Sequence, residues 1–124
     1  MPNKDGAASH KEVEAYLLNM EDAWLDYPFG EEVAVYKVGD PSTASGQAKM
    51  FALVAEKSNP VRLSLKCDPL LAETLRERYE SVMPGYHLNK KHWNTIILSG
   101  QLSWEEVQDL IRLSYNLVSG KHPG

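Results

Sequence analysis

Apolar residues recur every three or four positions in three stretches of the chain, and this spacing predicts three helices. Each stretch has its own start signal: a Ser-x-x-Glu capping box begins at Ser9 and another at Ser103, and an Asp-Pro pair begins at Asp68. The predicted inward-facing residues are Val13, Tyr16, Leu17, Met20 and Trp24 in the first helix, Leu71, Leu75 and Tyr79 in the second, and Trp104, Val107, Ile111, Ser114 and Val118 in the third.

Strand-like patterns fill the intervals between these helices. Residues 33–38, 50–55 and 95–98 are rich in β-branched and other apolar residues, and a short extended piece near residues 86–88 is a candidate partner for the last of these runs. The clearest strand spans residues 61–67, where apolar side chains alternate with polar ones. Residues 39–48 have the composition of a loop, and we expect them to be mobile and to carry no function.

The order of these elements is helix, three strands, helix, one or two strands, helix. It predicts an α+β domain of two layers, with the helices on one face of an antiparallel sheet. The length of 124 residues suits a single domain. We assign residues 9–120 to this domain, residues 1–8 to a flexible tail and residues 121–124 to a second tail.

Charge and composition narrow the classes of function. The net charge is −4, and residues 1–32 contain eight carboxylates but only two lysines, whereas a strong nucleic-acid binder is usually basic. No apolar run is long enough to span a bilayer, and the start of the sequence lacks the apolar segment of a signal peptide. Cys67 is the single cysteine, so the chain forms no internal disulfide, which is typical of a cytoplasmic protein. We therefore expect a cytoplasmic protein without a membrane partner, and we expect it to be a monomer.

Several segments resemble those of one family of small bacterial proteins. The stretch PGYHLNKKHWNTIIL at residues 84–98 is similar to the signature segment of the YjbR/MmcQ family, and the resemblance continues in YPFGEEVAVYKV from Tyr27, KMFAL from Lys49, LSLKCDP from Leu63 and LIRLSYNLV from Leu110. The resemblance implies an α-β(3)-α-β(2)-α fold, similar to type III secretion chaperones and to frataxin-like topologies. The family is often labelled DNA-binding, so the resemblance also implies a DNA-binding role.

The sequence contains no recognisable catalytic or metal-binding motif. The helix that follows Cys67 could activate its thiol, but the alternation of the strand turns Cys67 toward the core, which predicts an unreactive side chain. His87 and His92 are close along the chain, yet their spacing fits no zinc motif. Phosphate-binding loops, dinucleotide fingerprints and nucleophile elbows are absent. We therefore expect a protein that is not an enzyme and that holds neither a metal nor a cofactor.

The segment 86–93 is the first candidate site, because it concentrates histidines, lysines and aromatic residues. Lysines suit phosphates and aromatic faces suit bases, so this mixture favours weak, salt-sensitive DNA binding. The candidate DNA-contacting residues are His87, Asn89, Lys90, Lys91 and His92, with Arg76 and Arg78 as added charges nearby. A structural interpretation stays open, in which Tyr86, Leu88 and Trp93 anchor a crossover to the core while Asn89 and His87 satisfy backbone groups.

The outward face of the strand at residues 61–67 is the second candidate site. Its predicted residues are Arg62, Ser64 and Lys66, beside Lys37 of the first strand. If Tyr36 or Met50 joins them, this face becomes a docking platform for a protein or for single-stranded nucleic acid. The alternative function is therefore a protein-interaction adaptor or chaperone-like module. The structural interpretation, a solvated sheet face, stays open beside it.

Overall fold

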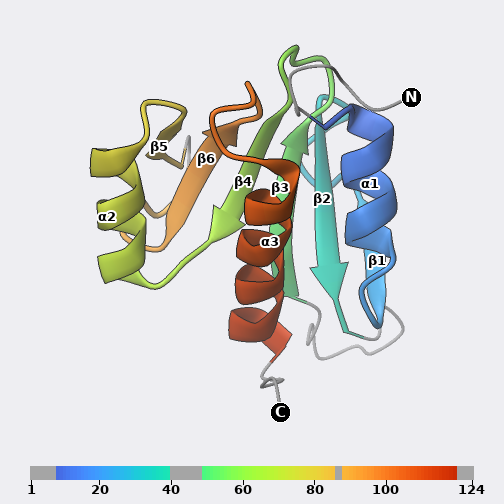
Figure 1. The fold of residues 1–124 in the computed structure, drawn as a ribbon. Helices are drawn as coiled ribbons and strands as arrows, with labels where there is room; N and C mark the ends of the chain where they lie inside the picture. The colour runs from blue at the N-terminus through green and yellow to red at the C-terminus, as the bar shows by residue number, and fades with distance from the viewer. Residues whose placement is uncertain (1–7, 40–48, 86–87, 120–124) are drawn as a thin grey trace.

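The structure is a computed structural model that describes residues 8–39, 49–85 and 88–119. Its elements follow in the order α1 (His10–Leu18), β1 (Ala23–Asp26), β2 (Val33–Val38), β3 (Lys49–Ala55), β4 (Arg62–Lys66), α2 (Pro69–Arg78), β5 (Val82–Pro84), β6 (Trp93–Ile97) and α3 (Trp104–Ser119). The six strands form one sheet in the order β1-β2-β3-β4-β6-β5, and each neighbouring pair is antiparallel. All three helices lie on one face of the sheet (Figure 1), so the expected two-layer α+β class is confirmed.

The predicted helix starts are confirmed by their hydrogen bonds. Ser9 Oγ accepts from the backbone N–H of Glu12 at 3.2 Å, and the Glu12 carboxylate accepts from the N–H of Ser9 at 3.0 Å. Ser103 and Glu106 repeat this exchange at the start of α3, at 2.9 and 3.1 Å. The carboxylate of Asp68 accepts from two N–H groups in the first turn of α2. These bonds satisfy donors that a helix start otherwise leaves unpaired.

Strand β1 is the main departure from the expected order of elements. The helical spacing of apolar residues extends to Trp24, but α1 ends at Leu18 and Asp22 takes a positive φ of 62°. Trp24 then lies opposite Lys37 in the antiparallel β1–β2 pair, and its indole N–H donates to the carbonyl of Gly39 at 2.8 Å. The chain therefore contains one more strand than the three expected before the second helix.

The partner of β6 also differs from the expectation. Strand β5 covers Val82–Pro84, just before the expected extended piece near residues 86–88, and Met83 lies opposite Thr95. Residues 86–87 of the expected extended piece lie outside the described residues, as do residues 1–7 and 120–124 of the expected tails and residues 40–48 of the expected loop. Ala8, assigned to the first tail, is buried in the core.

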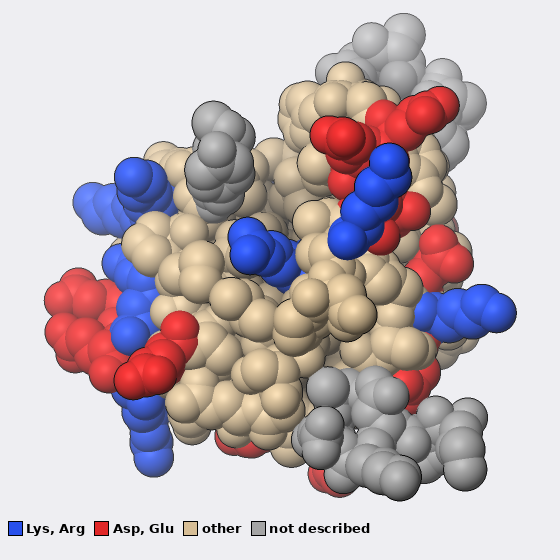
Figure 2. Space-filling view, turned by 90° about the horizontal axis from the view of Figure 1, so that it is seen from above, with Lys and Arg blue, Asp and Glu red and all other residues tan. Residues whose placement is uncertain are grey.

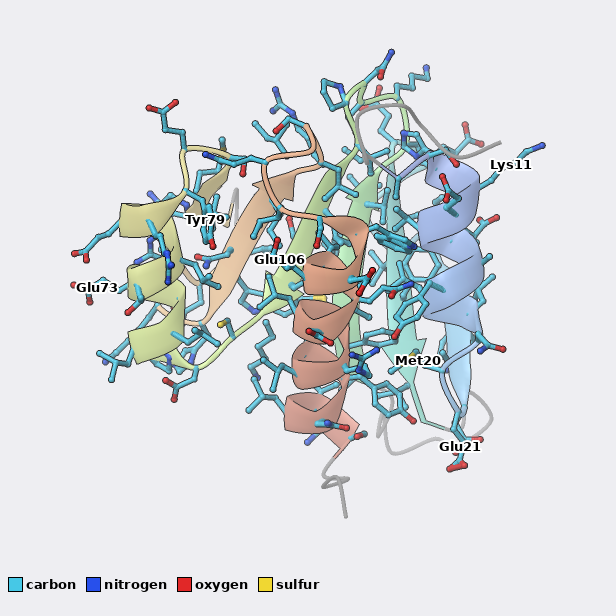
Figure 3. All side chains as sticks on the ribbon, in the orientation of Figure 1. Lys11, Met20, Glu21, Glu73, Tyr79 and Glu106 are labelled. Carbon is cyan, nitrogen blue, oxygen red and sulfur yellow. The ribbon has the colours of Figure 1, made fainter. Side chains whose placement is uncertain are left out.

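The main core lies between the sheet and the helices. In β4 the alternation is confirmed, because Leu63 and Leu65 are buried on the helical side while Arg62 is exposed. In Figure 3, Met20 and Tyr79 point toward this layer and both pack against it, whereas Lys11 and Glu73 point outward. None of the helices in the described residues has the length and apolarity needed to cross a membrane.

A smaller cluster occupies the opposite face of the sheet. Val35, Leu53 and Trp93 are buried there, at 0%, 7% and 6% exposure, and Val33, Met50 and Leu88 pack against them. We call this face the open face, because the three helices lie on the other side of the sheet. Its apolar side chains pack on one another and largely bury their own cluster.

Candidate functional site

Two exposed residues of the predicted DNA-binding site, Lys90 and Lys91, lie on a turn, which we call the lysine turn and define as residues 88–92. The turn precedes β6, and the N–H groups of His92 and Trp93 both donate to the carbonyl of Asn89, at 3.1 and 2.9 Å. The side-chain oxygen of Asn89 accepts from the N–H of Lys91 at 2.9 Å. Of the two roles considered for Asn89, the structure therefore shows the turn cap.

Arg76 fixes the lysine turn to α2. Its Nη1 donates to the carbonyl of Lys90 at 3.0 Å and to the side-chain oxygen of Asn94 at 2.8 Å. Asn94 is 2% exposed, and its amide nitrogen donates to the carbonyl of Ala72 in α2 at 3.1 Å. We call this pair the Arg76–Asn94 brace. Arg76 thus lies close to the turn, but its guanidinium is bonded to a backbone carbonyl and to the side chain of Asn94.

The brace leaves the two lysines of the turn on the surface. Lys90 and Lys91 are both exposed, and neither takes part in the ion pairs that the structure shows among its described residues, Lys37–Asp26 and Arg112–Asp109. Lys66, at the end of β4, lies directly opposite Trp93, the residue that follows the turn. Three lysines are therefore gathered at one corner of the sheet.

The other residues of the first predicted site are more dispersed. Arg78 is exposed near the end of α2, with its guanidinium 5.8 Å from the centre of the Tyr79 ring. His92 is half-buried, and its carbonyl accepts from the N–H of Cys67 at 2.7 Å. His87 lies outside the described residues.

Trp93 is unavailable for stacking on bases, because it is buried in the small cluster on the open face. The chain passes close to it: a side chain at Gly85 would place its Cβ only 2.8 Å from the Cβ of Trp93. The N–H of Gly85 also donates to the carbonyl of Trp93 at 2.9 Å. The aromatic part of this segment described by the structure is therefore an anchor for the turn.

The open face brings together only part of the second predicted site. Lys37 lies there beside Trp24, 5.3 Å from its ring centre, and donates to Asp26 at 2.9 Å. This hydrogen bond, ahead of the simple charge attraction, lowers the pKa of the Asp26 carboxyl. Ser64 is bonded to the hydroxyl of Thr95 at 2.8 Å, so its hydroxyl is also engaged.

The two residues considered as additions to this face go to opposite sides of the sheet. Met50 packs against the open-face cluster. Tyr36 is buried on the helical side, where its hydroxyl lies 3.5 Å from the Glu14 carboxylate of α1. Burial first, and then the nearby carboxylates, raise the pKa of Tyr36. Of the two possible additions, Met50 therefore joins the open face and Tyr36 does not, because Tyr36 lies on the helical side of β2.

Charges of both signs are mixed on the face of the molecule that is seen from above (Figure 2). Figure 2, viewed from above, shows lysines, arginines and carboxylates in mixed groups, without a continuous basic area on that face. Such a surface is unsuited to a long stretch of phosphate backbone. On the face seen in Figure 2, a contact with a polyanion is therefore restricted to a small area.

The environment of Cys67 does not favour nucleophilic chemistry. The residue is buried, and burial together with the charge of Asp68 raises the pKa of its thiol, which reduces the fraction of reactive thiolate. Within residues 8–39, 49–85 and 88–119, no three histidine, cysteine or acidic side chains converge on a point where a metal ion could bind.

Comparison with known proteins gives a consistent relationship. A family model described as YjbR matches residues 18–117. The protein YbdF of Escherichia coli O157:H7 is 33% identical over 114 residues, which cover 92% of this chain and 87% of YbdF. The protein YjbR of Escherichia coli K12 is 37% identical over 86 residues, covering 69% of this chain and 73% of its own. Neither name states a ligand or a reaction.

Solved structures show the same relationship in three dimensions. The crystal structure of Deinococcus radiodurans protein DR2400, with a DUF419 domain, has a TM-score of 0.85 at 36% identity and covers 98% of this chain and 84% of its own. A crystal structure of a Pseudomonas syringae protein has a TM-score of 0.72 at 28% identity, covering 90% of this chain and 99% of its own.

Proposed function

The chain belongs to the YjbR family, and we propose that it is a non-enzymatic protein that binds DNA weakly through its lysine turn. The observation that carries this proposal is the fixed presentation of Lys90 and Lys91. Both side chains are exposed, while Asn89 caps the turn and Arg76 holds the carbonyl of Lys90. A backbone that is already ordered loses less conformational freedom when its lysines contact phosphates.

The number of lysines sets the strength of this binding. Lys90 and Lys91 neutralise about two phosphates, and Lys66 at the same corner adds about one more, so the logarithmic salt slope on duplex DNA is between about −2 and −3. Such a site binds measurably at low salt and loses most of its affinity at physiological salt. Because phosphate contacts carry no sequence information, we expect little preference among duplex sequences.

Charge reversal at the turn tests the proposal. Fluorescence anisotropy with a labelled 20-base-pair duplex in about 20 mM salt should detect binding by the wild type and none by Lys90→Glu/Lys91→Glu. The matched control is Lys11→Glu/Lys57→Glu, which changes the net charge by the same amount at two other exposed lysines. Equal loss in both variants would show that only net charge matters. Unchanged binding in the turn variant would refute the site.

The adaptor function receives less support on the open face. Lys37 is paired with Asp26, and the apolar side chains at the centre of that face are largely buried in their own cluster. A docking platform needs a contiguous exposed apolar area, and these residues do not provide one.

A further inference from the structure

The helical layer contains an apolar groove between α2 and α3. These two helices stand apart on the sheet, and β4 and β6 pass between them (Figure 1). The groove is narrow, with an enclosed volume of only about 10 Å³, and most of its lining is apolar: Leu65, Leu75, Ile96, Leu110 and Leu113, together with Lys66, Cys67 and Asn94. Beside it lies a cavity of about 290 Å³, lined by Lys66, Cys67, Asp68, Pro69, His92 and Leu117, which shares Lys66 and Cys67 with the groove. The walls thus come from both helices and the floor from β4 and β6.

The opposite side of α3 is filled in a different way. There Tyr16 of α1 packs edge-to-face on Trp104, with ring centres 5.6 Å apart, and accepts a hydrogen bond from Arg112. Polar and aromatic side chains therefore join α1 to α3. The groove on the α2 side has no comparable contact among the described residues.

Exposed leucines border the groove. Leu113 is 45% exposed and Leu117 is 52% exposed, and their spacing of four residues places them on the same stripe of α3. Leu70, at the start of α2, is 74% exposed, although it lines neither the groove nor the cavity beside it. Three of the six large hydrophobic side chains that are most exposed in the described residues therefore lie on the two helices that form this groove.

The cavity beside the groove adjoins the lysine turn. His92 lines the cavity, Lys90 and Lys91 immediately precede it, and Arg76 comes from the helix that forms one wall. The carboxylate of Asp68 is already engaged with the N–H groups that begin α2. The surroundings of the cavity therefore favour negative charge in an occupant, whereas the groove itself favours apolar side chains.

We propose that the α2–α3 groove binds a short segment of a partner protein, one that presents leucine-like side chains followed by carboxylates. The stretch of α3 from Leu110 to Leu117 is about 10 Å long, which matches two turns of an amphipathic helix. Its apolar side chains pack against Leu113 and Leu117, and its acidic end lies toward the lysine turn. The small contact area limits the affinity to the micromolar range or weaker.

Two other occupants fit the groove less well. A second copy of this chain would bring the same cationic turn to a symmetric contact, without carboxylates to complement it. A stable dimer buries about 800 Å² on each partner. The groove follows α3 for only about 10 Å, which is too small a surface for such a contact. DNA phosphates provide no apolar surface to cover the leucines.

A synthetic peptide provides a direct test. The probe is a fluorescein-labelled, 14-residue amphipathic peptide with leucines spaced four apart and two C-terminal glutamates. We expect Leu113→Gln/Leu117→Gln to weaken its binding by tenfold or more. The matched control, Leu18→Gln/Phe29→Gln, replaces two exposed hydrophobic residues elsewhere and should bind within twofold of the wild type. A peptide with lysines in place of the glutamates should bind at least tenfold more weakly.

The same variants separate this site from the DNA site. The groove variant should lose the peptide and keep the DNA affinity of the wild type, whereas Lys90→Glu/Lys91→Glu should lose DNA and also bind the glutamate peptide at least tenfold more weakly. The proposal is overturned if the groove variant, shown by circular dichroism to be folded, binds the peptide as the wild type does. It is equally overturned if the lysine peptide binds as tightly, or if the wild type dimerises in sedimentation experiments and the groove variant does not.

Discussion

Replacement of Ser114 by alanine tests whether one buried hydroxyl holds α3 to the sheet. Ser114 is 0% exposed, and its Oγ donates to the carbonyl of Phe51 in β3 at 2.6 Å. The same oxygen accepts from the N–H of Lys66 in β4 at 2.9 Å. Alanine fits the same space, so the substitution removes these two bonds without creating a large cavity.

The expected cost follows from the groups that lose their partner. A buried backbone donor or acceptor left without a hydrogen bond costs about 1–3 kcal/mol. Ser114→Ala leaves one of each, and Lys66 is only half-buried, so we expect the free energy of unfolding to fall by about 2–4 kcal/mol. For a domain whose total stability is of the order of 5–15 kcal/mol, the variant remains folded but is clearly weakened.

Urea denaturation followed by tryptophan fluorescence measures this change. The midpoint should fall while the slope of the transition stays constant, since the surface exposed on unfolding is nearly the same. Ser99→Ala, at an exposed serine, is the control and should change the stability by less than ~0.5 kcal/mol. If Ser114→Ala costs less than ~1 kcal/mol, the two hydrogen bonds do not contribute as the structure indicates.

Three further outcomes can be checked in the same way. Trp93→Ala should destabilise the fold by ~3–5 kcal/mol, measured by urea denaturation, because the ring is buried. Native Cys67 should react with a thiol reagent far more slowly than the unfolded chain, because burial raises its pKa. The pairing with Lys37 depresses the folded-state pKa of Asp26, so its stabilisation is present above about pH 4 and is lost as the pH falls through that lowered pKa. Asp26→Asn should therefore lower the urea midpoint at pH 7, with the difference from the wild type shrinking in acid.

The parts of the fold that the sequence predicted correctly depend on local signals. The capping residues Ser9, Asp68 and Ser103 act on N–H groups only two or three positions away, so their spacing is visible in the chain itself. The alternation of apolar and polar residues in β4 is also a local signal. Successive side chains of a strand point to opposite faces of the sheet, so the sequence of β4 alone shows which residues face the core.

The missed strand shows where local patterns are insufficient. The apolar residues from Val13 to Trp24 keep helical spacing, yet the helix stops at Leu18 and the chain reverses at Asp22. Pairing with β2 and the bond from Trp24 to Gly39 favour the extended form, and these partners come 9 to 15 residues later. Tertiary contacts therefore outweigh the periodicity of a segment in which both structures fit the pattern.

The candidate site has the same division between local and distant causes. Two consecutive lysines are visible in any reading of the sequence, whereas the brace that positions them joins Arg76 to Asn94 across 18 residues. One signal was nevertheless present: Asn94 is a polar residue inside a strand whose neighbours Trp93 and Ile96 are buried. A buried amide must find hydrogen-bonding partners, so this asparagine predicts a specific contact even though its sequence position cannot identify the partner. The guanidinium of Arg76 and the carbonyl of Ala72 are those partners. Because the same guanidinium also donates to the carbonyl of Lys90, the hydrogen bonding of buried Asn94 determines where Lys90 is held.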